Sequence, residues 1–376
     1  MMLTIEKVDF SNPSQIHRFV MLPFRLYKDS PQFVPPLISD VKTMLNPKKH
    51  PYYEHSQAEF FIAVRDGRDV ARLGVMNNDH FNKYHGKKQA HFTLFDSEDD
   101  SEAVQALFER AFDWAHAHGL VEIVGPRGLA SFDGYGILID GFQYRQMMNM
   151  YSYNFPYYAR LVENLGFVKE VDFTSFLLET TTFRFPGEIK EIARRVMERN
   201  KFEVHPFKNK RELVSWAHRI GEAYNHAFVE NWEYYPLTPR EVDFMVSQLL
   251  TIGDPNLIKI ITLKDEVVGF ALAFPDISAA LQRAKGRLTP WAIADILLEI
   301  RRTTWVTANG GGVLPQYHGR GANALLYNEM LKLMDVYHFK YVDIPQNAET
   351  ASQMRSDILR MGGKPYRVHR VYRRNL

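Results

Sequence analysis

The order of predicted secondary-structure elements in the first half of the chain recurs in the second half. In each half, the spacing of apolar residues predicts a strand, two helices, three strands, a helix, a strand, a helix and a closing strand. An internal repeat of this length indicates two copies of one fold. We therefore expect an α/β (α+β) protein with two tandem domains, residues 1–185 and 186–376.

The predicted elements of both halves have well-marked ends, at glycines, prolines or polar clusters. The helices are expected at 11–28, 38–46, 101–118, 157–165, 211–228, 239–251, 321–338 and 349–361. The strands are expected at 3–8, 58–64, 70–76, 90–95, 121–124, 171–178, 202–206, 257–263, 267–274, 304–309, 341–344 and 365–372. The insertion at 276–302 is expected to be mostly helical.

A turn with two glycines, Gly319 and Gly321, comes directly before the predicted helix 321–338. Glycines let the backbone approach a ligand closely, and the first amides of a helix lack partners and favour an anion. Arg320 adds a positive charge that can bind a phosphate. The pattern is typical of a phosphate site, although a tight turn with a glycine cap is the simpler alternative. The nucleotide-triphosphate loop and the dinucleotide fingerprint do not match these residues.

The residues of this turn also resemble the acyl-CoA signature of the GNAT acyltransferase superfamily. Gln316-x-x-Gly319-x-Gly321, preceded by Val313-x-Pro315, matches the anchor positions of that signature. The order of elements in each half is similar to the GNAT fold, a mixed, mostly antiparallel sheet flanked by helices. Further segments resemble a bacterial group of tandem-GNAT proteins whose substrates are unassigned. These segments are Leu22–Lys28, Phe33–Leu37, Gly136–Phe142 and Gly269–Asp276.

The resemblance implies that the second half binds acetyl-CoA or another acyl-CoA as co-substrate. The residues implied to hold it are Gly312, Val313, Leu314, Gln316, Gly319, Arg320, Gly321, Ala322 and Asn323. The corresponding turn of the first half, residues 95–101, has no glycine and four carboxylates. Two unit charges at about 4 Å repel by roughly 1–4 kcal/mol, so a pyrophosphate should be rejected there. The domain 1–185 is therefore expected to be a degenerate copy.

The usual catalytic residues of the superfamily are not at their expected positions in this sequence. The general-acid tyrosine is replaced by Ile358, and the nearby asparagine by Ala351. The resemblance then leaves two options: the thiolate leaves unassisted, or another tyrosine such as Tyr341 donates the proton. Glu230 and Tyr235 are further candidates, because they lie in the loop that usually sets acceptor specificity. A surface loop with core aromatics is the alternative interpretation of that loop.

The composition limits the partners that we expect. Lys and Arg (46) nearly balance Asp and Glu (44), whereas nucleic-acid binders usually show a basic excess. No apolar run reaches about 18 residues, so we expect no membrane partner. The N-terminus lacks an apolar signal core, which indicates a cytoplasmic protein. The chain has no cysteine and no metal-ligand spacing, so no metal site is expected.

The first functional hypothesis is an N-acyltransferase that moves an acyl group, with acetyl as the first expectation, to an amine. The acceptor is expected to be a small molecule or a peptide. A non-catalytic acyl-CoA sensor is the second hypothesis, since Ile358 and Ala351 depart from the usual pattern. A Fem-like aminoacyltransferase is the third, and the near-neutral charge disfavours its tRNA donor. A monomer and a homodimer both remain open.

Overall fold

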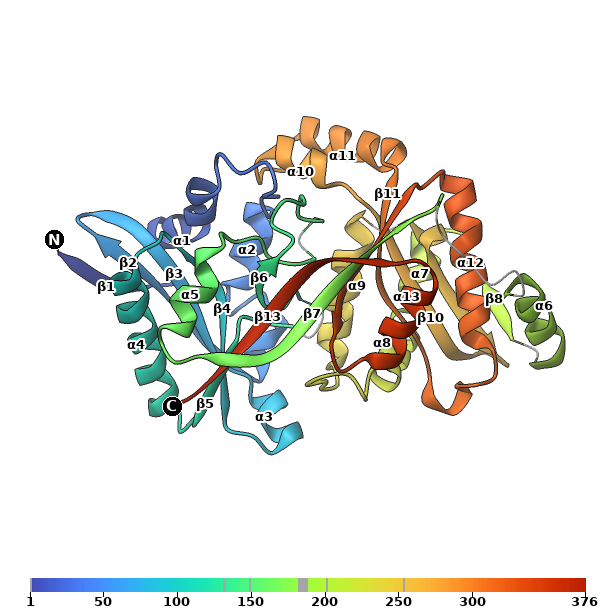
Figure 1. Ribbon diagram of the computed structural model, residues 1–376, viewed down its shortest axis with the longest axis horizontal. Helices are drawn as coiled ribbons and strands as arrows, with labels where there is room; N and C mark the ends of the chain where they lie inside the picture. The colour runs from blue at the N-terminus through green and yellow to red at the C-terminus, as the bar shows by residue number, and fades with distance from the viewer. Residues whose placement is uncertain (1, 131–132, 149, 182–188, 201, 253) are drawn as a thin grey trace. The chain divides into compact units, whose positions relative to one another are not determined.

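The computed structural model describes residues 2–130, 133–148, 150–181, 189–200, 202–252 and 254–376 (Figure 1). Contacts divide the chain into two compact units. Unit 1 comprises Met1–Thr174, Ser278–Leu297 and Arg367–Leu376, and unit 2 comprises Ser175–Ile277 and Leu298–Tyr366. The expected domain boundary at 185/186 lies outside the described residues and stays a prediction.

Unit 1 contains a mixed sheet in the order β1-β2-β3-β4-β5-β13, with β6 also pairing with β13. Its strands are β1 (Leu3–Lys7), β2 (Gln57–Arg65), β3 (Arg68–Asn77), β4 (Gln89–Ser97), β5 (Glu122–Gly125), β6 (Ile137–Asp140) and β13 (Lys364–Asn375). The pairings are antiparallel except that β4 and β5 are parallel. The last strand of the chain thus lies beside β5, with Tyr372 opposite Gly125.

Helices cover both faces of the unit 1 sheet, because β2 is apolar on both sides. Phe61 and Ala63 face a core shared with α4 and α5, whereas Phe60 and Ile62 face a core shared with α1 and α2. This alternation follows from the two-residue period of a strand. The helices are α1 (Pro13–Leu26), α2 (Ile38–Met44), α3 (Asp79–His85), α4 (Ser101–Ala117) and α5 (Tyr157–Glu163). A helical insertion after residue 275 contains α10 (Ser278–Ala284) and α11 (Pro290–Arg302).

Unit 2 repeats this arrangement with the strand order β7-β12-β11-β10-β9-β8. Its strands are β7 (Val168–Glu179), which begins in unit 1, β8 (Glu203–His205), β9 (Ile258–Leu263), β10 (Glu266–Pro275), β11 (Trp305–Val313) and β12 (Tyr341–Ala348). Here β11 and β12 form the parallel pair. The helices are α6 (Ile189–Asn200), α7 (Lys210–Ser215), α8 (Ala217–Ala227), α9 (Pro239–Ile252), α12 (Ala322–Tyr337) and α13 (Ser352–Arg360).

The structure confirms the expected fold class, a mixed α/β fold with a sheet flanked by helices. Several elements differ from expectation: α3, α6 and β6 were not predicted, and β12 continues to Ala348 beyond its expected end at 344. The predicted helix 211–228 is broken at Trp216 into α7 and α8, and the indole of Trp216 stacks on His205 with ring centroids 4.0 Å apart. The strand expected at 304–309 continues to Val313, because pairing with β10 overrides the poor strand propensity of Gly310–Gly312.

Burial of His369 on β13 predicts that stability depends on pH. Burial lowers the pKa of this histidine to about 4 from an ordinary value of 6.5, although its Nε2 lies 3.0 Å from the Ser152 carbonyl oxygen. Between these pH values the unfolded chain binds a proton that the folded protein does not. The stabilising contribution is therefore complete above pH 6.5 and lost as the pH falls to 4.

We expect His369→Gln to remove the contribution of His369 to the pH dependence of the free energy of unfolding. This contribution amounts to about 3 kcal/mol. Urea unfolding of both proteins at neutral pH and between pH 4 and 5 measures it. His91 and all carboxylates are retained in the variant, so they contribute to the pH dependence of both proteins. The contribution of His369 is therefore the difference between the pH dependences of the two proteins. An identical loss of stability in both proteins would contradict the prediction.

Candidate functional site

The parallel ladder between β11 and β12 ends early. It joins Trp305 to Tyr341, Val306 to Val342 and Thr307 to Asp343. Beyond this point β11 continues to Val313 and remains paired with β10, while β12 continues to Ala348. The β12-facing backbone groups of residues 308–313 therefore lie outside this ladder. Such groups can bind a ligand instead of a neighbouring strand.

A β-bulge lies in β11 just after the end of this ladder. Ala273 pairs with Ala308 and Ala271 with Gly311, so Leu272 opposes two residues, Asn309 and Gly310. Gly310 has φ of 111°, a conformation that suits glycine. Bulges bend a strand, increase its twist and re-aim its side chains, and they are common beside active sites. The bulge was not predicted, since no local residue pattern shows where a ladder slips.

The turn after β11 holds two glycines in left-handed conformation. Gly319 has φ of 71° and open space around it, and Gly321 has φ of 86° and forms the N-cap of α12. Gly321 provides no side chain to cap the helix, so the first amides of α12 are not capped in this way. A Cβ on Gly321 would lie 2.3 Å from Cγ2 of Val196 on α6, so packing as well as backbone conformation requires glycine here.

Backbone and side-chain contacts around the turn hold its shape. The Leu314 amide donates to the Val268 carbonyl oxygen at 2.9 Å, and Nε2 of His318 lies 2.8 Å from the Val313 carbonyl oxygen. The Tyr317 hydroxyl donates to Glu266 at 3.0 Å. The Arg320 guanidinium lies 5.4 Å from the centre of the Tyr317 ring, which keeps its positive charge at the turn.

A cavity of about 410 Å³ opens at the N-terminal end of α12. It is lined by Tyr317, His318, Gly319, Gly321, Ala322, Asn323, Ala324, Tyr327, Asp357, Arg360 and Met361. The lining therefore combines uncapped helix amides with the exposed Arg360, whose Nη1 lies 3.9 Å from Asp357. This volume is within the range of ligand sites, and amides beside a cation suit an anionic group.

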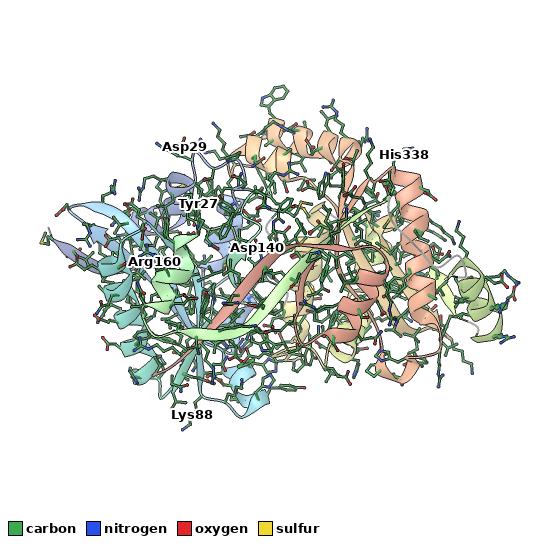
Figure 2. All side chains as sticks on the ribbon, in the orientation of Figure 1. Tyr27, Asp29, Lys88, Asp140, Arg160 and His338 are labelled. Atoms are coloured by element: carbon green, nitrogen blue, oxygen red, sulfur yellow. The ribbon has the colours of Figure 1, made fainter. Side chains whose placement is uncertain are left out.

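The corresponding turn in unit 1 has the opposite character. Asp100 caps α4 and accepts from the Ala103 amide at 3.0 Å, and it pairs with Arg65 at 2.6 Å. Burial raises the pKa of Asp100, but these hydrogen bonds together hold that pKa below its ordinary value. The other acidic groups of the turn also pair with arginines: Asp96 with Arg72, Glu98 with Arg25 and Arg68, and Asp99 with Arg160. Arg160 lies on α5 and is labelled in Figure 2. Glu102, in the first turn of α4, pairs with Arg65. This turn is a structural network of ion pairs.

The three candidate catalytic residues differ in exposure and in the element that carries them. Glu230 is exposed and Tyr235 is buried in the segment after α8. Tyr341 opposes Trp305 and stacks on its ring, with centroids 4.5 Å apart. That position is four residues before the bulge, or about 13 Å at the rise of a strand. The three assignments stay predictions.

The two departures from the family pattern occupy structural positions. Ile358 is buried in the core under α12 and α13, and Ala351 is the N-cap residue of α13. A pair that the sequence did not suggest lies where the ladder ends: the Tyr366 hydroxyl donates to Asp343, and both residues are buried. Tyr366 is the third residue of the closing strand β13 and Asp343 lies on β12, so only the folded sheet brings them together.

Known proteins resemble this chain in sequence and in fold. No family model matches the chain. A protein of Caulobacter vibrioides named bacterial ceramide synthase is 26% identical over 385 residues, covering 98% of this chain and 97% of that protein. Protein YghO of Escherichia coli is 27% identical over 375 residues, covering 98% and 94%. A tandem GNAT protein from the clavulanic acid biosynthesis pathway superimposes with a TM-score of 0.56 at 11% identity, covering 100% and 98%. The chain therefore has the tandem GNAT fold.

The contact between Gly321 and Val196 yields a stability prediction. Gly321→Ala should destabilise the protein by about 2–4 kcal/mol, because it combines left-handed backbone strain with overpacking. Gly319→Ala is the matched control, since it has similar φ but open space, and it should cost only about 1–2 kcal/mol. Urea unfolding measures both.

A second substitution separates the two causes. Val196→Ala, added to Gly321→Ala, should recover the overpacking part and leave the backbone part, so that the double variant approaches Gly319→Ala. If Gly321→Ala and Gly319→Ala lost the same stability, and if the double variant recovered none of it, Val196 would not constrain the position of Gly321.

Proposed function

We propose that this protein is an N-acyltransferase that moves an acyl group from an acyl-CoA to the amine of a long-chain amino alcohol. The cavity at the uncapped end of α12, beside the strand whose ladder ends at Thr307, is the observation that carries the proposal. The GNAT fold supports acyl transfer. The acceptor class is supported by the relative named ceramide synthase, since a ceramide is the N-acyl amide of a long-chain amino alcohol.

In this proposal, the pyrophosphate of the acyl-CoA binds at the turn before α12. The amides of Ala322 and Asn323 are the donors nearest the N-cap, and the left-handed Gly319 lets the ligand approach the backbone. Arg320 and Arg360 supply positive charge, and both are exposed and able to reach a phosphate. The pantetheine arm then extends along β11 beyond Thr307, where the ladder with β12 has ended.

The reaction needs one bond to form and one to break. The amine nitrogen attacks the thioester carbon, the carbon–sulfur bond breaks, and the proton lost by the amine balances the one gained by the thiolate. A β12-facing amide of β11 beyond Thr307 would stabilise the oxyanion, because it lies outside the ladder and is held rigidly by pairing with β10.

Tyr366 and Asp343 are the groups that we assign to proton transfer in this mechanism. Asp343 lies opposite Thr307, at the last rung of the ladder, and accepts the hydrogen bond of the Tyr366 hydroxyl. A tyrosine there offers the hydroxyl that Ile358 lacks. Tyr341 is the competing tyrosine, but it stacks on Trp305 at the opposite end of the ladder.

The variant Asn323→Asp tests the anion site directly. Asn323 is exposed, lines the cavity and lies in the first turn of α12, where a carboxylate favours helix stability. The nearly isosteric substitution should weaken CoA binding by about fivefold to several hundredfold, because the two charges repel by roughly 1–4 kcal/mol. Isothermal titration calorimetry measures the affinity.

Asn323→Gln is the control for this variant, since it retains a neutral amide at the same position and should bind CoA nearly as the parent does. Thermal unfolding should show Asn323→Asp to be at least as stable as the parent. Equal affinities for the aspartate and glutamine variants would argue against a pyrophosphate at α12.

The activity is tested by thiol release from acetyl-CoA and palmitoyl-CoA with a long-chain amino alcohol and with short amines. We expect an amide product, detected by mass spectrometry, from the long-chain acceptor. Tyr366→Phe should lower kcat about a hundredfold, as loss of a proton donor does, whereas Tyr341→Phe should leave kcat nearly unchanged. The reverse order would restore Tyr341 as the donor, and CoA binding without thiol release from any pair would favour a sensor.

A further inference from the structure

Helix α11, which contains the boundary between units 1 and 2 at Leu297/Leu298, has an exposed apolar face. Trp291 is 85% exposed, Leu297 58%, Ile293 47% and Leu298 44%. Ala292 is the one buried residue of the helix. At 3.6 residues per turn, the exposed side chains fall on one side of α11, opposite Ala292. Large apolar side chains scattered singly are ordinary at a surface, but a contiguous set on one helix marks an interaction site.

The insertion that contains α11 is firmly held by α10, so the exposed face is not needed to attach it. Nε2 of Gln282 donates to the carbonyl oxygens of Pro31 and Phe33 at 2.8 and 2.9 Å. The Ile38 amide donates to the Gly286 carbonyl oxygen at 2.9 Å. Gly286 itself is packed so closely that a Cβ would lie 2.7 Å from the Phe24 ring. The exposed side chains of α11 are therefore not needed to attach the insertion.

Positive charges flank this apolar face at both ends of α11. Lys285 and Arg287 precede the helix, and Arg301 and Arg302 end it, and all four are exposed. The two carboxylates of α11, Asp295 and Glu299, are only partly exposed. Asp295 is neutralised by Arg283, whose Nε lies 2.7 Å from it. The surface presented by α11 is therefore apolar in the middle and basic at its ends.

We propose that α11 is an interfacial helix that docks the protein on an anionic lipid bilayer. An exposed tryptophan among leucines and isoleucines, with arginines beside them, is the side-chain set that suits the boundary between headgroups and acyl chains. The flanking cations complement anionic headgroups. A soluble protein partner would not by itself account for basic residues at both ends of an uncharged apolar strip.

This proposal concerns docking and not spanning. None of the described helices is long and apolar enough to cross a membrane, and α11 has 13 residues, whereas a span needs about 20. The expectation of no membrane partner was drawn from the lack of a long apolar run, an argument that does not apply to a helix lying in the interface plane. The proposal stands on α11 alone, and it also fits acceptors whose long chains partition into bilayers.

Vesicle sedimentation with the full-length protein tests the docking surface. We expect the protein to sediment with phosphatidylcholine vesicles that contain phosphatidylglycerol, and more weakly with pure phosphatidylcholine or at high salt. The double variant Trp291→Ser/Leu298→Ser should reduce the partition coefficient at least tenfold. Both residues are exposed, so the fold should be retained.

The matched control is Val336→Ser, which removes a 70% exposed apolar side chain from α12 and should leave vesicle binding unchanged. Arg301→Glu/Arg302→Glu should remove the preference for anionic vesicles. An unchanged partition of the Trp291→Ser/Leu298→Ser variant, or no binding of the parent protein, would overturn the proposal. So would light scattering that shows a dimer abolished by the same variant, because the face would then be a contact between copies.

The outcome for docking is separable from the outcome for the proposed function. CoA affinity, measured by calorimetry on the soluble protein, should be equal in the parent and in Trp291→Ser/Leu298→Ser, since neither residue lines the cavity. Vesicle binding without CoA binding would overturn the proposed function alone, and CoA binding without vesicle binding would overturn the docking surface alone.

Discussion

The candidate site depends on the point at which β11 and β12 cease to pair. Three residues of each strand form the parallel ladder, and the last rung joins Thr307 to Asp343. Pairing with β10 holds β11 in place beyond that rung, so its β12-facing groups are rigid without belonging to the ladder. The bulge at Asn309–Gly310, the glycine turn and the cavity at α12 all follow along the same strand and its continuation.

The two halves show how one arrangement of strand, turn and helix can have opposite electrostatics. In unit 2 the helix α12 begins at a glycine that provides no cap, so its first amides are available to a ligand. In unit 1 the helix α4 begins at Asp100, which caps the helix and pairs with Arg65. The same helix end therefore has uncapped amides that suit an anion in one unit and is part of an ion-pair network in the other.

The sequence predicted the features that arise from local pattern. The glycine turn and the helix after it were visible because their signals lie within a few residues, and the repeat was visible because each half has the same order of elements. The end of the β11–β12 ladder, the bulge and the contact between Tyr366 and Asp343 were not predicted. These features depend on partners distant in the chain, as does the helix break at Trp216, whose ring stacks on His205.

A crystal structure with bound acyl-CoA tests the central claim most directly. The account predicts one acyl-CoA per chain, with its pyrophosphate on the amides of Ala322 and Asn323 and its thioester beside β11 beyond Thr307. The Tyr366 hydroxyl should then lie within reach of the sulfur, directly or through a water molecule. A pyrophosphate bound at the start of α4, or a thioester remote from the end of the β11–β12 ladder, would contradict the account.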